Sequence, residues 1–203
     1  EYFEEQTLET AGVRVVAWPD HGFRVLHNTE RAIATPSDAE GLKWRVPNNP
    51  VFIEMYKAWG LNPIPMAWGE VFSSLQTGVI HGGDNVIRNL IDFKMYQFED
   101  HVTLTHHMLE IVPLIIGDSW FQRQDADIQD ALIRAASDAW EWQFDAMGED
   151  LQSTREELEG HGMTITEAQN MSEWQQARDI WPQFYDKMGG EEVLDRVLSF
   201  IEE

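Results

Sequence analysis

The segment Gly41–Asn85, GLKWRVPNNPVFIEMYKAWGLNPIPMAWGEVFSSLQTGVIHGGDN, decides the fold class because short extended runs alternate in it with short helical runs. Lys43–Val46 is a short run that Pro47–Pro50 interrupts, which predicts a strand followed by a break. Val51–Trp59 has the apolar spacing of a helix, and Gly60 ends it.

The second half of this segment repeats the alternation. Asn62–Met66 is predicted to be extended, Gly69–Thr77 to be helical, and Val79–Ile80 to start a strand. Gly82–Asn85 has the composition of a turn, and Val86–Phe93 follows it as a helix.

The same alternation continues outward from this segment in both directions. On the N-terminal side we expect a helix end over residues 2–11, strands over 13–18 and 23–27, a turn over 19–22 and a helical turn from Pro36 to Gly41. On the C-terminal side we expect strands over residues 102–107 and 111–116. This pattern of short strands and helices between residues 13 and 117 predicts an α/β fold.

The last third of the chain has a different pattern. Residues 127–159 form one long helical pattern, followed by a brief strand over 162–165 and helices over 171–188 and 191–201. Apolar residues recur at helical spacing in the long segment, namely Ile128, Leu132, Ala135, Ala139, Trp142 and Ala146. We expect this stripe to pack against the α/β body, together with the aromatic residues Trp140, Trp142, Trp174, Trp181 and Phe184.

Composition excludes several classes of partner and site. The chain has 203 residues, 43% of them apolar, and no apolar run long enough to predict a membrane span. A net charge of −22 argues against nucleic acids and anionic membranes as partners. The absence of cysteine excludes disulfides, thiolate metal sites and cysteine nucleophiles. No basic region followed by an apolar stretch opens the sequence, so we expect that a signal peptide was removed or that the chain never had one.

Arg45 is the most informative polar residue. It lies near the end of a short predicted strand and just before the rigid Pro47 break, so backbone constrains it on both sides. A guanidinium offers paired donors that match a carboxylate. A salt bridge to a surface carboxylate is the other interpretation, and the local sequence alone favours it because most arginines are exposed.

Other motifs give weaker signals. Gly82–Asn85 before a helix could hold an anion on backbone amides, or it could be a turn with Asn85 as the helix cap. His106 and His107, with Glu110, suggest a metal, but neighbours on a strand point to opposite faces, so we predict no metal site. A single histidine facing a cleft is the alternative. No nucleophile elbow or acid/base dyad is recognisable, and we assign no catalytic residue.

Three motifs at matching spacing give a resemblance to a known family. Gly41–Asn48, Pro63–Ile80 and Gly82–Asn85 resemble the solute-binding proteins of tripartite ATP-independent periplasmic (TRAP) transporters. The resemblance implies a two-lobe fold of the periplasmic-binding-protein type, with mixed sheets, a long hinge-spanning helix and C-terminal helices. It also implies that the chain corresponds to the C-terminal two thirds of a member, without the N-terminal part.

The resemblance further implies a domain division and a set of ligand-binding residues. Residues 1–20 would be the remainder of the first lobe, 21–120 mainly the second lobe, and 121–203 the helices that pack across both lobes. Arg45 would form the two-pronged salt bridge to a ligand carboxylate, and Asn85 would hydrogen-bond the same group. Arg24 would be a second basic contact and Asn48 a polar neighbour of the ligand. Trp68 would pack an aromatic ring against the ligand body. Asp84 would accept hydrogen bonds from ligand hydroxyls, and His107 would lie at the edge of the cleft.

The function implied is that of a periplasmic receptor. It would bind a sugar acid, hydroxy acid or dicarboxylate without cofactor or metal, as a monomer, and deliver it to the membrane components of a TRAP transporter. A buried carboxylate needs a paired cation, and closure of the lobes then favours the loaded state. Two alternatives stay open: an enzyme that uses Arg45 for binding and Asp84 or His107 for proton transfer, and a sensory ligand-binding module.

Overall fold

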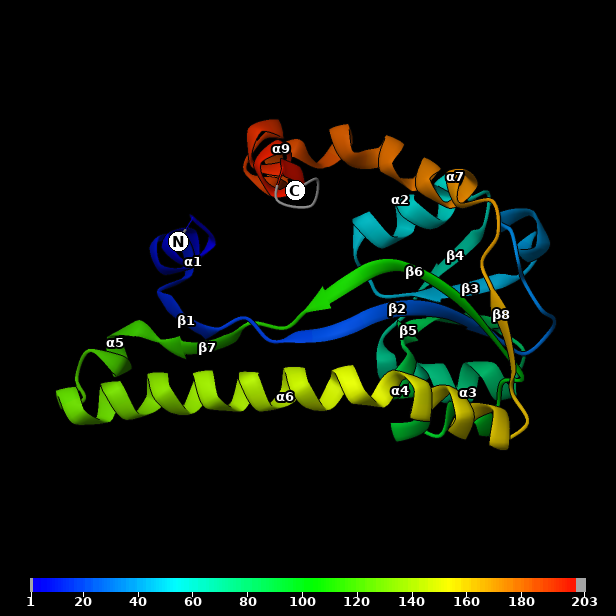
Figure 1. The fold of residues 1–203 in the computed structure, drawn as a ribbon. Helices are drawn as coiled ribbons and strands as arrows, with labels where there is room; N and C mark the ends of the chain where they lie inside the picture. The colour runs from blue at the N-terminus through cyan, green and yellow to red at the C-terminus, as the bar shows by residue number, and fades with distance from the viewer. Residues whose placement is uncertain (1, 200–203) are drawn as a thin grey trace.

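A six-stranded mixed sheet forms the centre of the computed structural model, which describes residues 2–199 except for the side chains of residues 147–151 (Figure 1). Its strand order is β4-β3-β5-β2-β6-β8, and a second sheet pairs β1 with β7. The strands are β1 (Val13–Ala17), β2 (Asp20–Asn28), β3 (Lys43–Val46), β4 (Asn62–Pro65), β5 (Gly82–Val86), β6 (His101–Ile111), β7 (Leu114–Gly117) and β8 (Thr164–Glu167).

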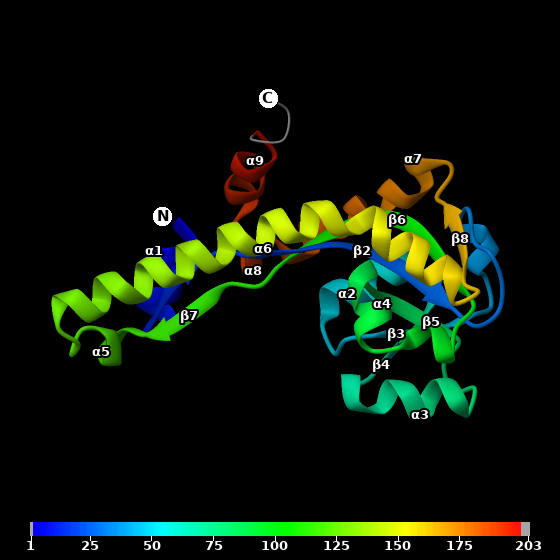
Figure 2. The same ribbon diagram turned by 60° about the horizontal axis from the view of Figure 1, so that its bottom comes forward.

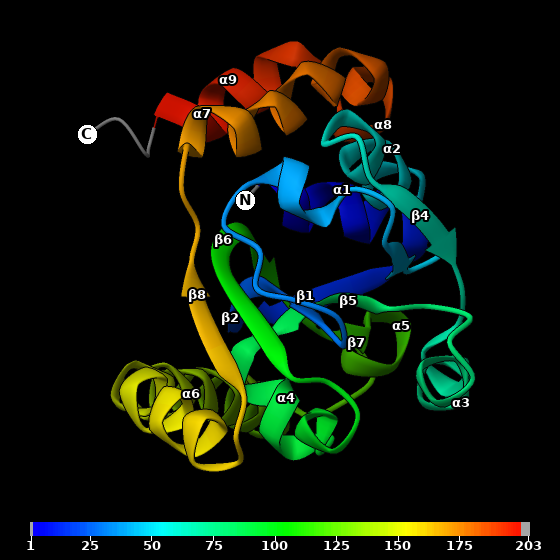
Figure 3. The same ribbon diagram turned by 90° about the vertical axis from the view of Figure 1, so that its right-hand side faces the viewer.

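Helices cover both faces of the six-stranded sheet. Figure 3 shows α2 and the C-terminal helices on one side of it, with α4 and α6 on the other. The α-helices are α1 (Tyr2–Ala11), α2 (Pro50–Ala58), α3 (Val71–Gln76), α4 (Ile87–Asp92), α5 (Asp118–Phe121), α6 (Ala126–Gly160), α7 (Met171–Trp174), α8 (Tyr185–Met188) and α9 (Glu191–Ser199). Short 3₁₀ helices are η1 (Pro36–Ala39), η2 (Trp68–Glu70), η3 (Met95–Gln97) and η4 (Gln175–Phe184). The prediction that the last helix reaches Ile201 lies outside the described residues.

Each face of the sheet carries its own apolar core. The adjacent β2 residues Val25 and Leu26 are both fully buried, and they belong to the clusters on opposite faces. Neighbouring side chains on a strand alternate between faces, so β2 must be covered on both sides. Trp44 of β3 packs in the cluster under α2, while Leu158 brings the end of α6 to the other cluster. The predicted α/β fold with a mixed sheet is confirmed.

Gly82–Asn85 forms a strand, so the predicted turn is wrong. This segment is β5, which lies between β3 and β2 in the sheet. A Cβ atom at Gly82 would collide with the backbone oxygen of His27 on β2. The glycine therefore permits a close approach of two strands. Asn85 is not a helix cap either, because α4 begins at Ile87 with Val86 as its N-cap.

β2 and β6 pair over a longer stretch than the sequence predicts. The predicted turn over residues 19–22 is wrong from Asp20 onward, because Asp20 and Gly22 pair with Ile111 and Glu110 of β6. Tertiary pairing overrides the local turn preference here. The ladder contains a bulge, since β6 takes five steps from Thr103 to Met108 while β2 takes two from Leu26 to Arg24. His106, within that bulge, has a positive φ of 45°.

The first half of α6 is exposed, contrary to the predicted packing. α6 runs past the six-stranded sheet along β1 and β7 (Figure 2). Ile128 is 46% exposed and Trp142 is 73% exposed, because the two-stranded sheet covers only part of the helix. The predicted packing is confirmed for Trp174 and Phe184, which are buried against α2. Among the described residues, no helix has both the length and the apolar character to cross a bilayer.

Candidate ligand-binding site

The predicted site residues gather at one edge of the six-stranded sheet. β3 and β5 run parallel, so Arg45 near the end of β3 and Asp84 in β5 lie at the same edge. β2 runs antiparallel to β5, and its Arg24 pairs with Val86 at that edge. The carboxyl ends of parallel strands are where α/β proteins commonly bind ligands.

Arg45 is buried without an acidic partner. The residue is 8% exposed, and its Nε and Nη2 atoms donate to the backbone oxygen of Met66 at 3.3 and 3.1 Å. Its guanidinium lies over the half-buried ring of Trp68, 5.4 Å from the ring centre. No carboxylate of the described residues forms an ion pair with it. The guanidinium of Arg45 is therefore free of direct contact with any carboxylate of the described residues.

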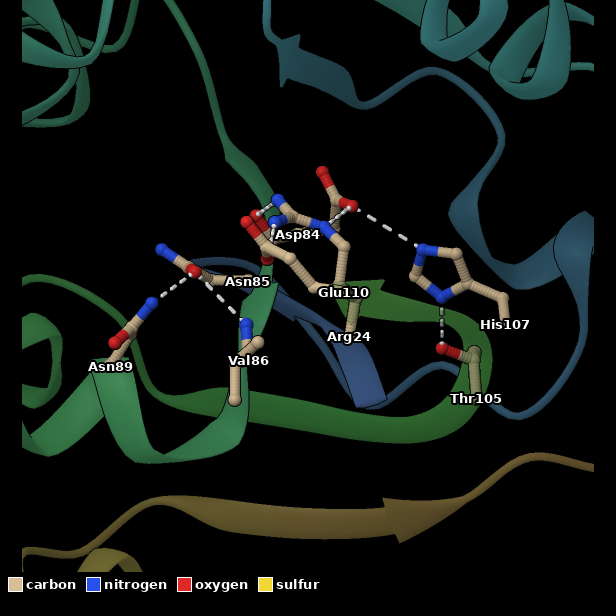
Figure 4. Close-up of polar contacts among 8 residues, drawn as sticks. All are labelled: Arg24, Asp84, Asn85, Val86, Asn89, Thr105, His107 and Glu110. Carbon is tan, nitrogen blue, oxygen red and sulfur yellow. Dashed lines mark hydrogen bonds and ion pairs between the residues drawn. The ribbon is translucent and has the colours of Figure 1, made fainter. Parts of the chain in front are cut away.

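Arg24 has the opposite environment, because two carboxylates hold it. Its Nε donates to Asp84 Oδ2 at 2.6 Å and its Nη2 donates to the Asp84 backbone oxygen at 2.6 Å. Its Nη1 donates to Glu110 Oε2 at 2.5 Å. Figure 4 shows the guanidinium between the two acidic side chains. Arg24 is therefore neutralised within the protein.

The two arginines differ in the direction of their pKa shifts. Burial lowers the pKa of Arg45, and the nearby charge of Asp84 only partly opposes this. Burial also acts to lower the pKa of Arg24, but the charges and hydrogen bonds of Asp84 and Glu110 outweigh it and raise that pKa. A guanidinium stays protonated in either case. The contrast identifies Arg45 as the arginine of the site that no carboxylate of the described residues contacts.

Asp84 is the acceptor at the centre of the network. Burial alone would raise its pKa, but hydrogen bonds and charges from His107 and Arg24 hold that pKa well below its usual range. Its Oδ2 atom lies 3.3 Å from His107 Nε2, and His107 Nδ1 lies 2.7 Å from Thr105 Oγ1 (Figure 4). An ionised carboxylate only accepts, so the hydrogen between Asp84 and His107 belongs to Nε2.

His106 and His107 make separate sets of contacts. The ring of His107 packs edge-on against Trp59, with 5.3 Å between ring centres. His106 packs edge-on against Phe23 at 5.9 Å, and burial lowers its pKa. Only His107 joins the network around Asp84.

Asn85 presents a free amide donor at the same edge. Its Oδ1 accepts hydrogen bonds from Val86 N at 2.9 Å and from Asn89 Nδ2 at 2.7 Å. Because its oxygen is occupied, its nitrogen faces elsewhere and bonds to no other described residue. An amide N–H near a guanidinium suits a carboxylate ligand. Asn48, by contrast, is exposed, and its assignment to the ligand stays a prediction.

Tyr56 carries no sequence signal for this site, and Glu110 stood out in the sequence only as a possible metal ligand beside His106 and His107. Tyr56 is fully buried, and its burial, the charge of Asp84 and a hydrogen bond to that carboxylate raise its pKa. Asp84 Oδ1 is likewise buried. No sequence signal links Glu110 to Arg24, because the bulge in β6 shifts the pairing of β6 with β2 by an amount that the sequence does not predict.

Comparison with known proteins gives a single family. The family model of bacterial extracellular solute-binding proteins, family 7, matches residues 4–188. A solute-binding protein of Roseobacter denitrificans is 35% identical over 179 residues, which are 88% of this chain and 55% of that protein. This chain thus spans about half the length of that curated relative.

Solved structures agree with this match. A TRAP periplasmic solute-binding protein from Roseobacter denitrificans with bound L-galactonate has a TM-score of 0.83 at 33% identity, covering 92% of this chain and 62% of that one. Another from Chromohalobacter salexigens with bound D-glucuronate has a TM-score of 0.88 at 30% identity, covering 98% and 65%. The expected fold of the periplasmic-binding-protein type is confirmed. This chain belongs to family 7 of the bacterial extracellular solute-binding proteins, the solute-binding proteins of TRAP transporters.

Proposed function

We propose that this protein is a periplasmic receptor that binds a small organic acid through Arg45 and delivers it to the membrane components of a TRAP transporter. The observation that carries the proposal is a buried guanidinium that no carboxylate of the described residues neutralises. Burying a charge without a counterion is costly, and an anionic ligand removes that cost. The family to which the chain belongs consists of solute-binding proteins.

The neighbours of Arg45 support a carboxylate as the bound group. A bidentate ion pair with Arg45 would fix the orientation of the carboxylate, and the free Nδ2 of Asn85 would donate to it. The Trp68 ring beside the guanidinium would pack against the ligand body. Asn48 and His107 complete the proposed set, with Asp84 and Arg24 facing the rest of the ligand.

Bound ligands of relatives point to sugar acids. The similar structures from Roseobacter denitrificans and Chromohalobacter salexigens hold L-galactonate and D-glucuronate. Both compounds join a carboxylate to a hydroxylated chain or ring, which fits an arginine beside buried acceptors such as Asp84. Hydroxy acids and dicarboxylates are also small organic acids, so the test below includes them.

The proposal includes a division of the chain into lobes. Residues 1–20 would complete a first lobe, residues 21–120 would form mainly the second, and residues 121–203 would pack across both. Ligand contacts from both sides would favour the closed state, which the transporter would recognise. The ligand would leave chemically unchanged, so no residue acts as a catalyst.

Titration calorimetry with sugar acids, hydroxy acids and dicarboxylates tests this proposal. Arg45→Ala should weaken the binding of the preferred acid by about 2–5 kcal/mol, because it removes the partner of a buried charge. Arg155→Ala is the matched control, since this arginine pairs with Glu159 and Glu167 at the surface, and affinity should not change.

Two results would overturn the proposal. Unchanged affinity in Arg45→Ala would remove the role assigned to that residue. Conversion of the ligand by the purified protein, lost in His107→Ala while binding survives, would favour the enzyme alternative. Mass spectrometry of the ligand after incubation decides the second point, and we expect the ligand to be recovered intact.

A further inference from the structure

The charges at the two ends of the site are unequal. Arg45 has no carboxylate partner among the described residues, whereas Arg24 has two, Asp84 and Glu110. One ligand carboxylate would therefore match the charge left at Arg45. A second ligand carboxylate would meet a cation that the protein has already neutralised.

Glu110 is the most exposed side chain of this network. Asp84 is fully buried at its side chain, whereas the Glu110 side chain keeps 33% of its surface exposed. Its Oε2 accepts from Arg24, and its Oε1 makes no hydrogen bond to another described residue. An ionised carboxylate can only accept, so Oε1 offers a position for a hydroxyl donor.

Glu110 also lines a cavity of about 480 Å³ between the β1–β7 region and α6. Ala17, Leu114 and Trp140 give this cavity apolar walls, and His21 and Gln143 add polar groups. Among the described residues that line it, none is a lysine or an arginine. A ligand carboxylate that lay beside Glu110 in this cavity would therefore find no lysine or arginine in its lining.

We propose that Glu110 restricts the site to organic acids with one carboxylate, whose far end carries hydroxyl groups. The inference rests on the proposed function, because it requires the ligand carboxylate to sit on Arg45. Glu110 repels a second ligand carboxylate, which has the same charge, and its Oε1 accepts hydrogen bonds from ligand hydroxyl groups.

Pairs of sugar acids that differ at one end test this specificity. Aldonic acids with four, five and six carbons are compared with the aldaric acids of the same carbon skeletons, in which the terminal hydroxymethyl group is a carboxylate. We expect the wild-type protein to bind the best aldonate at least about tenfold more tightly than its aldarate, since 1.4 kcal/mol of repulsion suffices for that ratio.

Glu110→Gln should reduce this preference at least about fivefold, because the amide keeps the size of the side chain and removes its charge. Glu110→Asp should retain the preference. Glu167→Gln is the control, since this carboxylate pairs with Arg155 and is 65% exposed at its side chain. The ratio of two affinities within one variant separates specificity from a general loss of folding.

Each outcome decides for or against a particular step. Equal binding of aldonate and aldarate by the wild type overturns the inference even if no variant can be purified, and so does an unchanged ratio in Glu110→Gln. Tight binding of unhydroxylated acids alone also overturns it, while the role of Arg45 stands. If no organic acid binds, the proposed function fails and the inference fails with it.

Discussion

Two regions of this molecule place similar residues in opposite environments. The sheet body is the six-stranded sheet with the helices that cover it, and the arm is the β1–β7 sheet with α5 and residues 126–146 of α6. Trp44 in the sheet body is fully buried, whereas Trp142 in the arm is 73% exposed. Apolar spacing determines which residues share a face of a helix or strand, but the neighbouring elements decide whether that face is covered.

The tryptophan pair gives the largest expected difference between the two regions. Trp44→Ala should lower the free energy of unfolding by about 3–5 kcal/mol, because it leaves a cavity between β3 and α2. Trp142→Ala should change it by less than about 0.5 kcal/mol in this chain. Urea unfolding followed by circular dichroism measures both. Similar losses in the two variants would show that the arm packs as closely as the sheet body.

The ion pairs of Arg24 in the sheet body and Arg14 in the arm give the next largest expected difference between the two regions. Asp84→Ala removes the buried partner of Arg24 and should destabilise the fold by about 3 kcal/mol, near the lower end for such pairs because Glu110 remains. Asp118→Ala breaks the pair with Arg14 in the arm, where both side chains are partly exposed, and should cost about 1 kcal/mol or less. The same unfolding measurement applies. Equal costs would contradict the buried character of the Arg24 network.

Two glycines complete the comparison, with the smallest expected loss in the sheet body. Gly82→Ala should cost about 1–3 kcal/mol, because the added methyl group meets the backbone of His27 and the strands must separate. Gly117 in the arm has a φ of −62° and open space around its Cβ position. Gly117→Ala should therefore be neutral or stabilise by up to about 1 kcal/mol. Thermal unfolding of the two variants in parallel resolves the difference, and a stable Gly82→Ala would refute the close approach of β5 to β2.

Local signals predicted the elements whose ends are marked by proline and glycine. The strand Lys43–Val46 is found at the predicted residues, and the helix after it begins at Pro50 and ends just before Gly60. β5 was mispredicted because Gly82 and Gly83 serve contacts with strands that are distant in sequence. A glycine that permits close approach and a glycine that permits a turn look the same in a sequence.

The site was predictable only in part. Arg24, Asp84 and His107 were singled out individually and are joined in one network, and Arg45 lies over the predicted Trp68. That Glu110 holds Arg24 together with Asp84 depends on which residues of β2 and β6 face each other. This register follows from the bulge around His106, and no local sequence pattern predicts that bulge.

The bulge also has a consequence for how this strand can change during evolution. Substitutions along β6 exchange one side chain at a fixed place, so ligand preference can drift residue by residue. An inserted or deleted residue between His106 and Glu110 would instead turn Glu110 to the other face of the sheet and away from Arg24. Variation in length should therefore accumulate in loops outside this strand, while β6 diversifies by replacement alone.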